Sequence, residues 1–338
     1  MSAKPLRETD IRPDHLIAEQ MARVQRDIDR LLEYQAQFVQ VDCPACMAHE
    51  RKGMYSKNGF QYVACLACET VYISPRPPKH ILEGYYETSE NYQYWSTHIF
   101  PASEDMRREH IIRPRADKVI EICGKYSEQP GILLEVGAGF GTFCEEISQR
   151  HYFEKIIAVE PTPPLAQRCK ERGLNVINLP IEAVNFQDLQ VDVVVSFEVI
   201  EHLFEPIEFI RSAAQLLKPG GILILTCPNV LGFDVQVLGT ASTTVDFEHL
   251  NYFHPKSLAH LVGRAGFETL EVSTPGKLDA ELVRKATLAG DFNLDSQPFL
   301  KQLLIDRWEN AGDAFQQFLV EQGLSSHMWL VARKKMDV

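Results

Sequence analysis

Short apolar runs alternate with amphipathic stretches between residues 131 and 275 of this chain. Strands are predicted at short runs rich in apolar residues, at Ile132–Val136, Ile156–Val159, Val176–Asn178, Val191–Phe197, Ile222–Cys227 and Phe267–Ser273. Helices are predicted where apolar positions recur at helical spacing, at Thr142–Arg150, Leu165–Arg172, Ile207–Leu217 and Lys256–Ala265. Apolar strands separated by helices are typical of a parallel sheet covered on both faces. The pattern therefore predicts an α/β fold.

The chain before residue 131 follows other patterns. Residues 1–13 are charged, which favours a loose arm. Residues 14–39 predict one helix with a heptad seam of apolar positions, at Ile17, Met21, Val24, Ile28, Leu31 and Phe38. Such a seam either packs on the chain's own domain or pairs two copies into a homodimer. Residues 79–129 predict helices and loops that are rich in tyrosine and arginine.

These patterns divide the chain into five segments. They are an N-terminal arm and helix (1–40), a Cys-rich segment (41–78), a helical Tyr- and Arg-rich segment on the substrate side (79–130), the α/β core (131–275) and a final segment (276–338). The Cys-rich segment has candidate strands at Gln61–Ala64 and Thr70–Ile73. In the final segment, residues 276–325 are predicted to be mostly helical and Met328–Lys334 to be a last strand.

Composition and charge narrow the classes of partner. The 338 residues are 45% hydrophobic and carry 34 basic and 46 acidic side chains, a formal net charge of −12. A surface this acidic repels phosphate backbones, so nucleic acid is not expected as the main partner. No apolar run approaches the ~20 residues of a membrane helix, and the stretch MSAKPLRETDIRPDH lacks the apolar core of a secretory signal. We therefore expect a cytoplasmic protein without a membrane partner.

Four of the eight cysteines are clustered in the second segment. Cys43 and Cys46 form one Cys-x-x-Cys pair, and Cys65 and Cys68 form another. Two such pairs can turn four thiolates toward one ion, which predicts a tetrahedral Zn²⁺ site in a small ribbon. A closed site of this kind is structural, because no coordination position is open to a substrate. Two redox pairs are the alternative, but the segment lacks the βαβ context of such motifs.

A glycine-rich turn follows the first strand of the core and opens a helix. Its glycines are Gly137, Gly139 and Gly141. The dinucleotide fingerprint requires Gly-x-Gly-x-x-Gly, which this spacing does not match. Glu160 ends the next strand, where a carboxylate can accept hydrogen bonds from a ribose diol. Leu179–Glu182 follows the third strand, where an adenine ring would lie, and Ser196–Leu203 follows the fourth.

In the order of these motifs, residues 131–274 resemble the class I S-adenosylmethionine-dependent methyltransferases. The resemblance implies a Rossmann-like sheet of seven strands, with Met328–Lys334 as an antiparallel strand beside Phe267–Ser273. It also implies that Glu135 and the glycines surround the amino-acid end of the cofactor and that Glu160 holds its ribose. The predicted cofactor-binding residues are Glu135, Gly137, Ala138, Gly139, Gly141, Thr142, Phe143, Glu160, Pro161, Ile181, Glu182, Phe197, Glu198, Val199 and His202.

The loop Val245–Pro255 follows the fifth strand and is expected at the carboxyl end of the sheet, facing the transferred methyl group. His249 is the predicted general base, because histidine titrates near neutral pH, and Glu248 and Tyr252 lie close to it in sequence. A structural histidine that ties down the loop is the alternative. The arginines of residues 107–115 predict either a clamp for a diphosphate or carboxylate, or a solvated helix face.

The ribbon, the Tyr-rich stretch and the loop Val245–Pro255, named the Glu-His loop after Glu248 and His249, together resemble the sugar C-methyltransferases. Members of that family act on nucleotide-linked keto-sugars. That resemblance implies that His249 is the base at the carbon beside the keto group, with Glu248 next to it. It also implies that one tyrosine enters the site, the candidates being Tyr85, Tyr86, Tyr92 and Tyr94. The chain departs from this family at Asp246, where the family has tyrosine, and in a mostly helical final segment where the family has a further α/β domain.

The predicted function is methyl transfer from S-adenosylmethionine to a small molecule, foremost a nucleotide-linked sugar or a related polysaccharide or secondary-metabolite precursor. The core also resembles the ubiquinone-type O-methyltransferases, so an O- or N-methyl acceptor is the alternative. An RNA methyltransferase that uses the ribbon as a reader is disfavoured by the net charge and by Ser196–Val199, which stands in place of an Asn-Pro-Pro-Tyr-type loop. A scaffold without activity is the third class.

Overall fold

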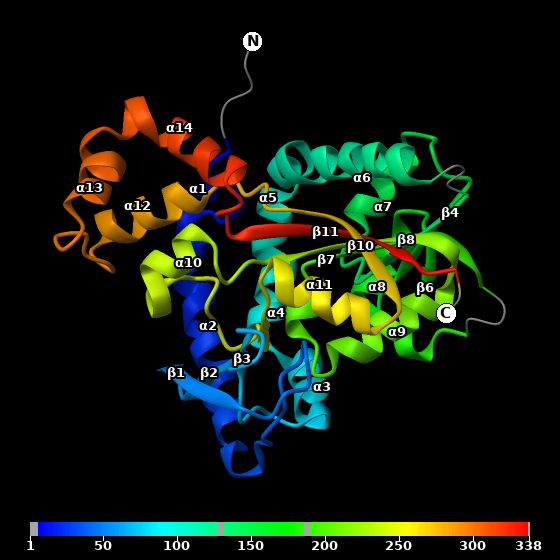
Figure 1. The fold of residues 1–338 in the computed structure, drawn as a ribbon, viewed down its shortest axis with the longest axis horizontal. Coiled ribbons are helices and arrows are strands. Elements are labelled where there is room, and N and C mark those ends of the chain that lie inside the picture. Colours follow the sequence, from blue (N-terminus) through cyan, green and yellow to red (C-terminus); the bar gives the residue numbers. More distant parts are fainter. Residues whose placement is uncertain (1–5, 128–130, 186–188, 337–338) are drawn as a thin grey trace.

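The computed structural model describes residues 6–127, 131–185 and 189–336. Its centre is a seven-stranded sheet in the order β10-β11-β8-β7-β4-β5-β6 (Figure 1). The strands are β4 (Ile132–Val136), β5 (Lys155–Val159), β6 (Asn175–Ile177), β7 (Val191–Phe197), β8 (Leu217–Pro228), β10 (Phe267–Ser273) and β11 (His327–Lys334). β11 is antiparallel to both of its neighbours, and the pairs from β8 to β6 are parallel. The predicted fold class and the placement of the last strand are confirmed.

Helices cover both faces of this sheet because its strands are apolar on both faces. Leu133 and Val193 belong to the core under α6 (Arg113–Tyr126) and α7 (Thr142–Ser148), whereas Leu134 and Val194 belong to the core on the opposite face. The opposite face packs against α9 and α11, which span Pro206–Leu216 and Pro255–Arg264. α8 (Pro163–Glu171) packs beside α7 through its buried cysteine. The glycine-rich turn therefore lies at the carboxyl edge of a rigid three-layer core.

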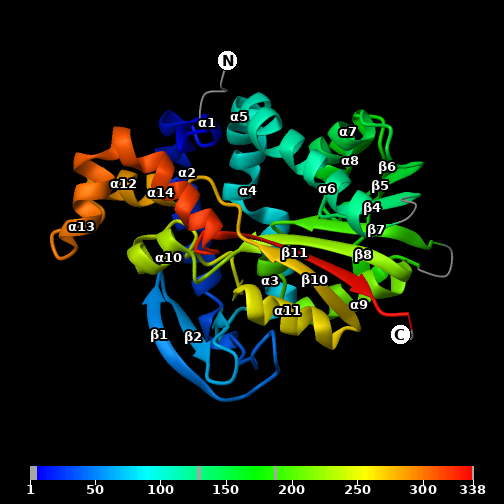
Figure 2. The same ribbon diagram turned by 45° about the horizontal axis from the view of Figure 1, so that its top comes forward.

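A second, four-stranded antiparallel sheet joins the Cys-rich segment to the loop that follows β8. Its order is β1-β2-β3-β9, with β1 at Arg51–Lys57, β2 at Phe60–Cys65, β3 at Val71–Ile73 and β9 at Asn251–Tyr252. Val71 lies opposite Tyr252 in this sheet. Figure 2 shows β1 and β2 on the side of the molecule away from α6. Two segments far apart in the sequence thus share one sheet.

The remaining helices flank these two sheets. They are α1 (Glu8–Ile11), α2 (Asp14–Leu32), α3 (Lys79–Thr88), α4 (Glu90–Tyr94), α5 (Phe100–Arg107), α10 (Phe233–Leu238), α12 (Asp279–Ala289), α13 (Pro298–Lys301) and α14 (Trp308–Glu321). The helices α10, α12 and α14 share a small apolar core of their own at one end of the large sheet (Figure 1). The mostly helical insertion predicted between the last two strands is confirmed. Among the described residues, no helix is both long enough and apolar enough to span a bilayer.

The N-terminal elements differ in part from the predictions. α2 ends at Leu32 and a short 3₁₀ turn follows at Gln35–Gln37, so the predicted single helix is shorter. Ile28 and Leu31 are buried in the core of the ribbon, whereas Met21 is 66% exposed. The second half of the seam therefore packs on its own chain, and a homodimer through this helix stays a prediction. Residues 1–5 of the predicted arm lie outside the described residues.

The strand β1 was not predicted. Most of its side chains are at least partly exposed, because it lies at the edge of its sheet and pairs only with β2. It therefore lacks the apolar run that revealed the other strands. The predicted positions of the strands β7 and β10 coincide with the observed ones, since both strands are bounded by polar or glycine-containing turns.

Candidate active site

The glycine-rich turn after β4 is tight and lies beside the carboxyl end of β5. The amide groups of Gly137 and Ala138 both donate to the carbonyl oxygen of Val159, at 2.9 and 3.2 Å. Gly137 has a φ of +78°, and a Cβ there would lie 2.5 Å from Cγ2 of Val199. A side chain at this position is excluded by both conformation and space. Gly139 also has a positive φ, but a Cβ there would contact nothing within 4 Å, so the turn leaves open space at its tip.

Glu160 lies against this open tip. Its Oε2 accepts the amide N–H of Gly139 at 2.8 Å, and its Oε1 accepts that of Thr162 at 2.9 Å. Burial raises the pKa of Glu160, and the two backbone hydrogen bonds partly offset that effect. Each carboxylate oxygen retains a second lone pair. The carboxylate is thus fixed in place while it can still accept hydrogen bonds from a diol.

Glu135 and Thr142 provide two further polar groups at the turn. Glu135 is buried near the carboxyl end of β4, accepts the Sγ–H of Cys144 at 2.9 Å, and has its pKa raised to about 8 by burial. The hydroxyl of Thr142 is buried and has no hydrogen-bond partner within the described chain. A buried hydroxyl without a partner costs free energy unless a ligand pairs with it. The carboxyl group of Glu135 and the hydroxyl of Thr142 could therefore pair with the polar end of a ligand that carries an ammonium group.

Five of the other predicted cofactor residues fall into a buried group and an exposed group. Phe143 and Phe197 are packed core residues with ring centroids 4.7 Å apart. Ile181 is also buried, whereas Pro161 and Glu182 are exposed side chains near the edge of β5 and β6. Their roles in cofactor binding stay predictions.

The loop after β8 brings His249 close to His202. Nδ1 of His249 lies 2.8 Å from the carbonyl oxygen of Thr244, and the two imidazole centroids are 4.7 Å apart. Oδ1 of Asp246 accepts the amide N–H of His249 at 2.8 Å and so shapes this turn. A carbonyl oxygen only accepts hydrogen bonds, so Nδ1 of His249 carries a proton and Nε2 keeps its lone pair.

Glu248 is fixed by groups from the Tyr-rich segment. It accepts hydrogen bonds from the hydroxyl of Tyr85 and from Nδ2 of Asn91, the latter at 3.1 Å. Burial raises the pKa of Glu248 to about 7, and the nearby Asp246 adds to the shift. Of the four candidate tyrosines, Tyr85 is thus the one whose hydroxyl is bonded to the Glu-His loop.

Tyr252 holds the loop from within. Its hydroxyl donates to the carbonyl oxygen of Asp246 at 2.6 Å and accepts the amide N–H of the same residue at 2.9 Å. The side chain is 1% exposed. The Tyr252 hydroxyl thus donates one hydrogen bond and accepts another within the loop, which suits a residue that positions the loop. Its catalytic role stays a prediction.

Several polar residues of this region were not predicted. Oγ1 of Thr226 donates to Oε1 of Glu198 at 2.6 Å, and Nδ1 of His327 lies 3.4 Å from the same oxygen. Asn91 contacts Glu248 from α4. These residues do not form a sequence motif, because they lie on strands and helices that are distant from one another in the sequence. Only the position of Thr226 near the end of a predicted strand could have suggested it.

The comparisons with known proteins bear on what this edge of the sheet does. Residues 107–272 match the family described as "Methyltransferase domain". The chain is an S-adenosylmethionine-dependent methyltransferase. It is 28% identical over 177 residues to the ubiquinone biosynthesis O-methyltransferase of Saccharophagus degradans, which covers 48% of this chain and 73% of that relative. It is 27% identical over 187 residues to the enzyme of the same name from Ruegeria pomeroyi, covering 48% of this chain and 74% of that relative.

Solved methyltransferase structures align with this chain at low sequence identity. A SAM-dependent methyltransferase from Archaeoglobus fulgidus superposes with a TM-score of 0.46 at 17% identity, covering 70% of this chain and all of that one. The plantazolicin methyltransferase BpumL, solved with SAH, superposes with a TM-score of 0.45 at 15% identity, covering 72% and 93%.

The four cysteines of the ribbon converge in this methyltransferase. Their Sγ atoms lie within 4.8 Å of one another, with Cys43 and Cys68 at 3.4 Å and Cys46 and Cys65 at 3.5 Å. Four sulfurs at ~2.3 Å from one tetrahedral ion would be about 3.8 Å apart. The cluster therefore fits Zn²⁺ in size and in donor type.

The ribbon of the methyltransferase is bonded directly to the Glu-His loop. The hydroxyl of Tyr62 donates to the carbonyl oxygen of Asp246 at 2.8 Å, and Nζ of Lys57 donates to that of Ser242 at 3.0 Å. Nε2 of His254 lies 2.8 Å from the carbonyl oxygen of Cys68. We therefore expect the conformation of the loop to depend on an ordered ribbon.

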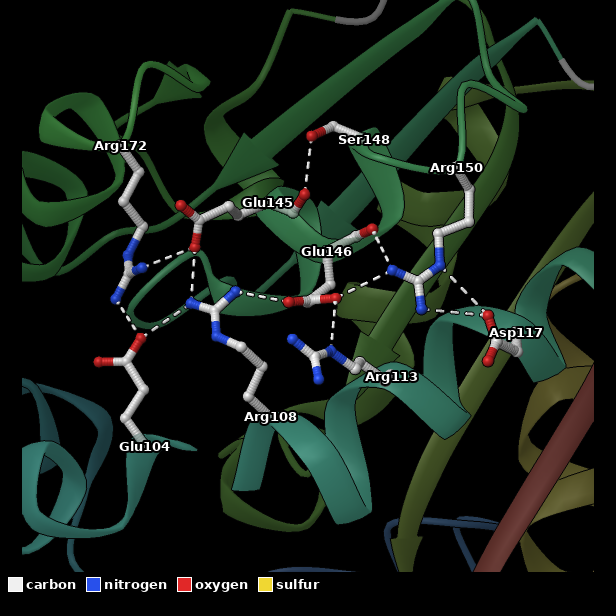
Figure 3. Close-up of polar contacts among 9 residues, drawn as sticks. All are labelled: Glu104, Arg108, Arg113, Asp117, Glu145, Glu146, Ser148, Arg150 and Arg172. Atoms are coloured by element: carbon white, nitrogen blue, oxygen red, sulfur yellow. Dashed lines mark hydrogen bonds and ion pairs between the residues drawn. The ribbon is translucent and has the colours of Figure 1, made fainter. Parts of the chain in front are cut away.

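The arginines of residues 107–115 are largely paired within the chain. Figure 3 shows Arg108 between Glu145 and Glu146 of α7, at 2.7 Å from each, with Arg113 and Arg150 also on Glu146 at 3.3 and 2.9 Å. The network fastens α6 to the helix that begins at the glycine-rich turn. The predicted diphosphate clamp is not supported at Arg108 or Arg113, because both are bound to Glu146.

Replacement of Glu146 by glutamine is expected to lower the free energy of unfolding by about 3 kcal/mol, since it leaves several arginines facing a neutral side chain. Burial alone would raise the pKa of Glu146, but Arg108 and Arg150 hold it below its usual value. A lowered pKa in the folded state stabilises the protein above the unfolded pKa of about 4.3. That contribution is lost as the pH falls through the lower, folded value.

Urea unfolding of both proteins at neutral pH and at decreasing pH measures this effect. Glu121→Gln is the matched control, because Glu121 is exposed and pairs only with Lys118 among the described residues, and it should change stability by less than about 1 kcal/mol. Equal stability of Glu146→Gln and Glu121→Gln would contradict the assignment.

Proposed function

We propose that this methyltransferase methylates a small molecule whose acceptor atom must lose a proton, foremost a nucleotide-linked keto-sugar. S-adenosylmethionine supplies an activated methyl group on a sulfonium centre. We assign its ribose to Glu160 and its amino-acid end to the turn around Glu135 and Thr142. The unpaired hydroxyl of Thr142 and the open tip at Gly139 fit such a ligand.

The observation that carries the proposal is the state of His249. Its Nδ1–H is held by the carbonyl oxygen of Thr244, which leaves Nε2 as a proton acceptor. The side chain is 17% exposed and sits on the loop that follows β8, at the edge where ligands bind in sheets of this kind. A neutral imidazole of fixed tautomer can remove the proton from the acceptor as the new bond to the methyl group forms.

The sugar class is supported by the surroundings of this base. Tyr85 and Asn91 converge on Glu248 from the segment that follows the ribbon. The resemblance to the sugar C-methyltransferases implies that one tyrosine of this segment enters the site. Tyr86 and Tyr92 extend this aromatic wall, with ring centroids 5.5 Å apart. Polar groups framed by aromatic side chains are typical of a site for a sugar-like acceptor.

O-methylation of another metabolite is the second candidate. It is favoured by the relatives from Saccharophagus degradans and Ruegeria pomeroyi, both of which are named ubiquinone biosynthesis O-methyltransferases. A phenolic or enolic oxygen would also lose a proton to His249, so the two candidates share the base and differ in the acceptor atom.

Incubation with S-adenosylmethionine and a panel of nucleotide keto-sugars and phenols, read by mass as one added CH₂, tests the proposal. We expect a keto-sugar product whose rate of formation falls at least ~100-fold in His249→Ala. His260→Ala is the matched control, because His260 is exposed on α11, and it should be as active as the parent. Product from phenols alone would discard the sugar and keep the base, and an active His249→Ala would discard the base.

We also propose that Cys43, Cys46, Cys65 and Cys68 hold one structural Zn²⁺. The convergence of four Sγ atoms supports this assignment. A ribbon this small has little apolar core of its own without the metal. Elemental analysis of the purified protein should find zinc bound at this site, and its absence after mild purification would reject the assignment.

A further inference from the structure

A second cluster of metal-ligating side chains lies outside the ribbon, at the carboxyl end of β7. Glu201 and His202 belong to the 3₁₀ turn Ile200–His202, and His249 comes from the loop after β8. Each offers one ligand atom, and these atoms lie within 4.8 Å of one another. An ion that keeps its ligands near 2.1 Å holds them about 3–4 Å apart, so binding would draw the three side chains slightly together.

The carboxylate of Glu201 is the first observation that points to a ligand. Its side chain is 2% exposed, and neither of its oxygens has a hydrogen-bond partner in the described chain. Oε1 lies 4.0 Å from Nε2 of His202. An ionised carboxylate that is buried without a hydrogen-bond partner is costly unless a cation compensates its charge.

The two imidazoles present lone pairs to the same place. Nδ1 of His202 lies 3.0 Å from the carbonyl oxygen of Glu248, and Nδ1 of His249 lies 2.8 Å from that of Thr244. Both Nδ1 atoms therefore carry protons, and both Nε2 atoms are free to ligate. A backbone carbonyl on Nδ1 is the partner that commonly orients a metal-bound histidine.

The ligand atoms of this cluster are therefore all hydrogen-bond acceptors: a carboxylate oxygen of Glu201 and the Nε2 atoms of His202 and His249. Among the described residues, no hydrogen-bond donor pairs with the carboxylate oxygens of Glu201, and the carboxylates of Glu198 and Asp246 lie near enough to act on it electrostatically. Water satisfies such a set poorly, since each water has only two protons to donate. A divalent cation satisfies all three groups at once and compensates the local charge.

We propose that Glu201, His202 and His249 bind one divalent first-row transition-metal ion, with its open positions directed to an oxygen of the methyl acceptor. Two imidazoles and one carboxylate suit Zn²⁺, Co²⁺ or Fe²⁺ better than Mg²⁺. The part concerning the acceptor rests on the proposed function, whereas metal binding does not. With the ion bound, Nε2 of His249 would be a ligand and not a base; an ion on the keto oxygen of the acceptor would lower the pKa of the neighbouring C–H, and its proton would pass to solvent water as the carbon–methyl bond forms.

Titration of the full chain with Co²⁺ in the absence of acceptor tests the binding. The ribbon is kept loaded with zinc, and calorimetry and visible absorption are recorded together. We expect one Co²⁺ to bind with weak d–d bands and without thiolate-to-cobalt charge transfer. Affinity should fall at least ~10-fold in Glu201→Gln, which keeps the shape of the side chain. His202→Ala should show the same loss, whereas His260→Ala, the matched control, should bind like the parent.

Thermal unfolding distinguishes a metal-binding role of Glu201 from a purely structural role of its carboxyl group. Co²⁺ should raise the melting temperature of the parent and leave that of Glu201→Gln unchanged, while both proteins bind S-adenosylmethionine equally. Equal Co²⁺ affinity in all variants, or cobalt bands of thiolate character alone, would overturn the site. Metal binding without turnover of any keto-sugar would keep the site and reject only the proposed substrate.

Discussion

Replacement of Glu160 by alanine is expected to weaken binding of S-adenosylmethionine at least ~100-fold. The side chain is 4% exposed, and its two oxygens are held by the amide groups of Gly139 and Thr162. Because these bonds fix the carboxylate before a ligand arrives, a ribose diol could add two charge-assisted hydrogen bonds without reorganisation. Each such bond contributes about 1.5 kcal/mol or more, and two together correspond to roughly 100-fold in affinity.

Calorimetry with S-adenosylmethionine and with S-adenosylhomocysteine measures this loss. Both ligands carry the same ribose, so both affinities should fall by the same factor. Glu171→Ala is the matched control, since Glu171 is an exposed glutamate at the end of α8. The variant Glu160→Gln preserves the shape of the side chain and guards against an effect of misfolding. Unchanged affinity in both Glu160 variants would remove the ribose from this residue.

Replacement of Cys65 by serine is expected to abolish zinc binding and to disorder the Glu-His loop. A structural zinc site contributes apparent binding free energies of about 10–16 kcal/mol, which is as much as the whole stability of a typical domain. The loop depends on the ribbon through Tyr62 and Lys57, which donate to its backbone carbonyls. Loss of the metal should therefore reach His249 without any change in the glycine-rich turn.

Elemental analysis and amide hydrogen exchange of the two proteins measure this effect. We expect no zinc in the ribbon of Cys65→Ser and fast exchange over residues 242–254, with S-adenosylmethionine affinity changed by less than about threefold. Cys123→Ala is the matched control, because Cys123 is buried on α6 in the core on the other face of the large sheet from the cysteine cluster. A Cys65→Ser protein that retains zinc, or a loop that stays protected, would contradict the coupling.

The sequence predicted the large sheet well for a definite reason. A strand buried on both faces has to be mostly apolar, so Val191–Phe197 and Ile222–Cys227 are visible without any knowledge of their neighbours. The strand β1 could not be found in this way, since Arg51–Lys57 is an edge strand with mostly exposed side chains. The end of α2 at Leu32 was missed because the apolar spacing continues to Phe38, which packs against the ribbon after the helix has ended.

The candidate site likewise has features that local sequence signals predicted and features that only tertiary contacts produced. Glycines at 137, 139 and 141 and an acidic residue after the next strand are local signals, and the structure brings Gly139 and Glu160 into contact at 2.8 Å. The pairing of Tyr85 with Glu248 joins residues 163 positions apart, so no spacing in the sequence contained it. The resemblance to known families supplied four candidate tyrosines, and only packing separated them.

By itself, the sequence determined the order of strands and helices, the glycine-rich turn and the two Cys-x-x-Cys pairs, because each of these arises from neighbouring residues. The tertiary structure alone decided which side chains meet across the carboxyl edge of the sheet. It joined the ribbon to the loop through β3 and β9, and it left Glu201 buried beside two imidazoles without a partner among the described residues. Such groups come together because burial of apolar surface on α2, the ribbon and the sheet fixes the backbone, and the polar side chains must then pair with whatever that packing places beside them.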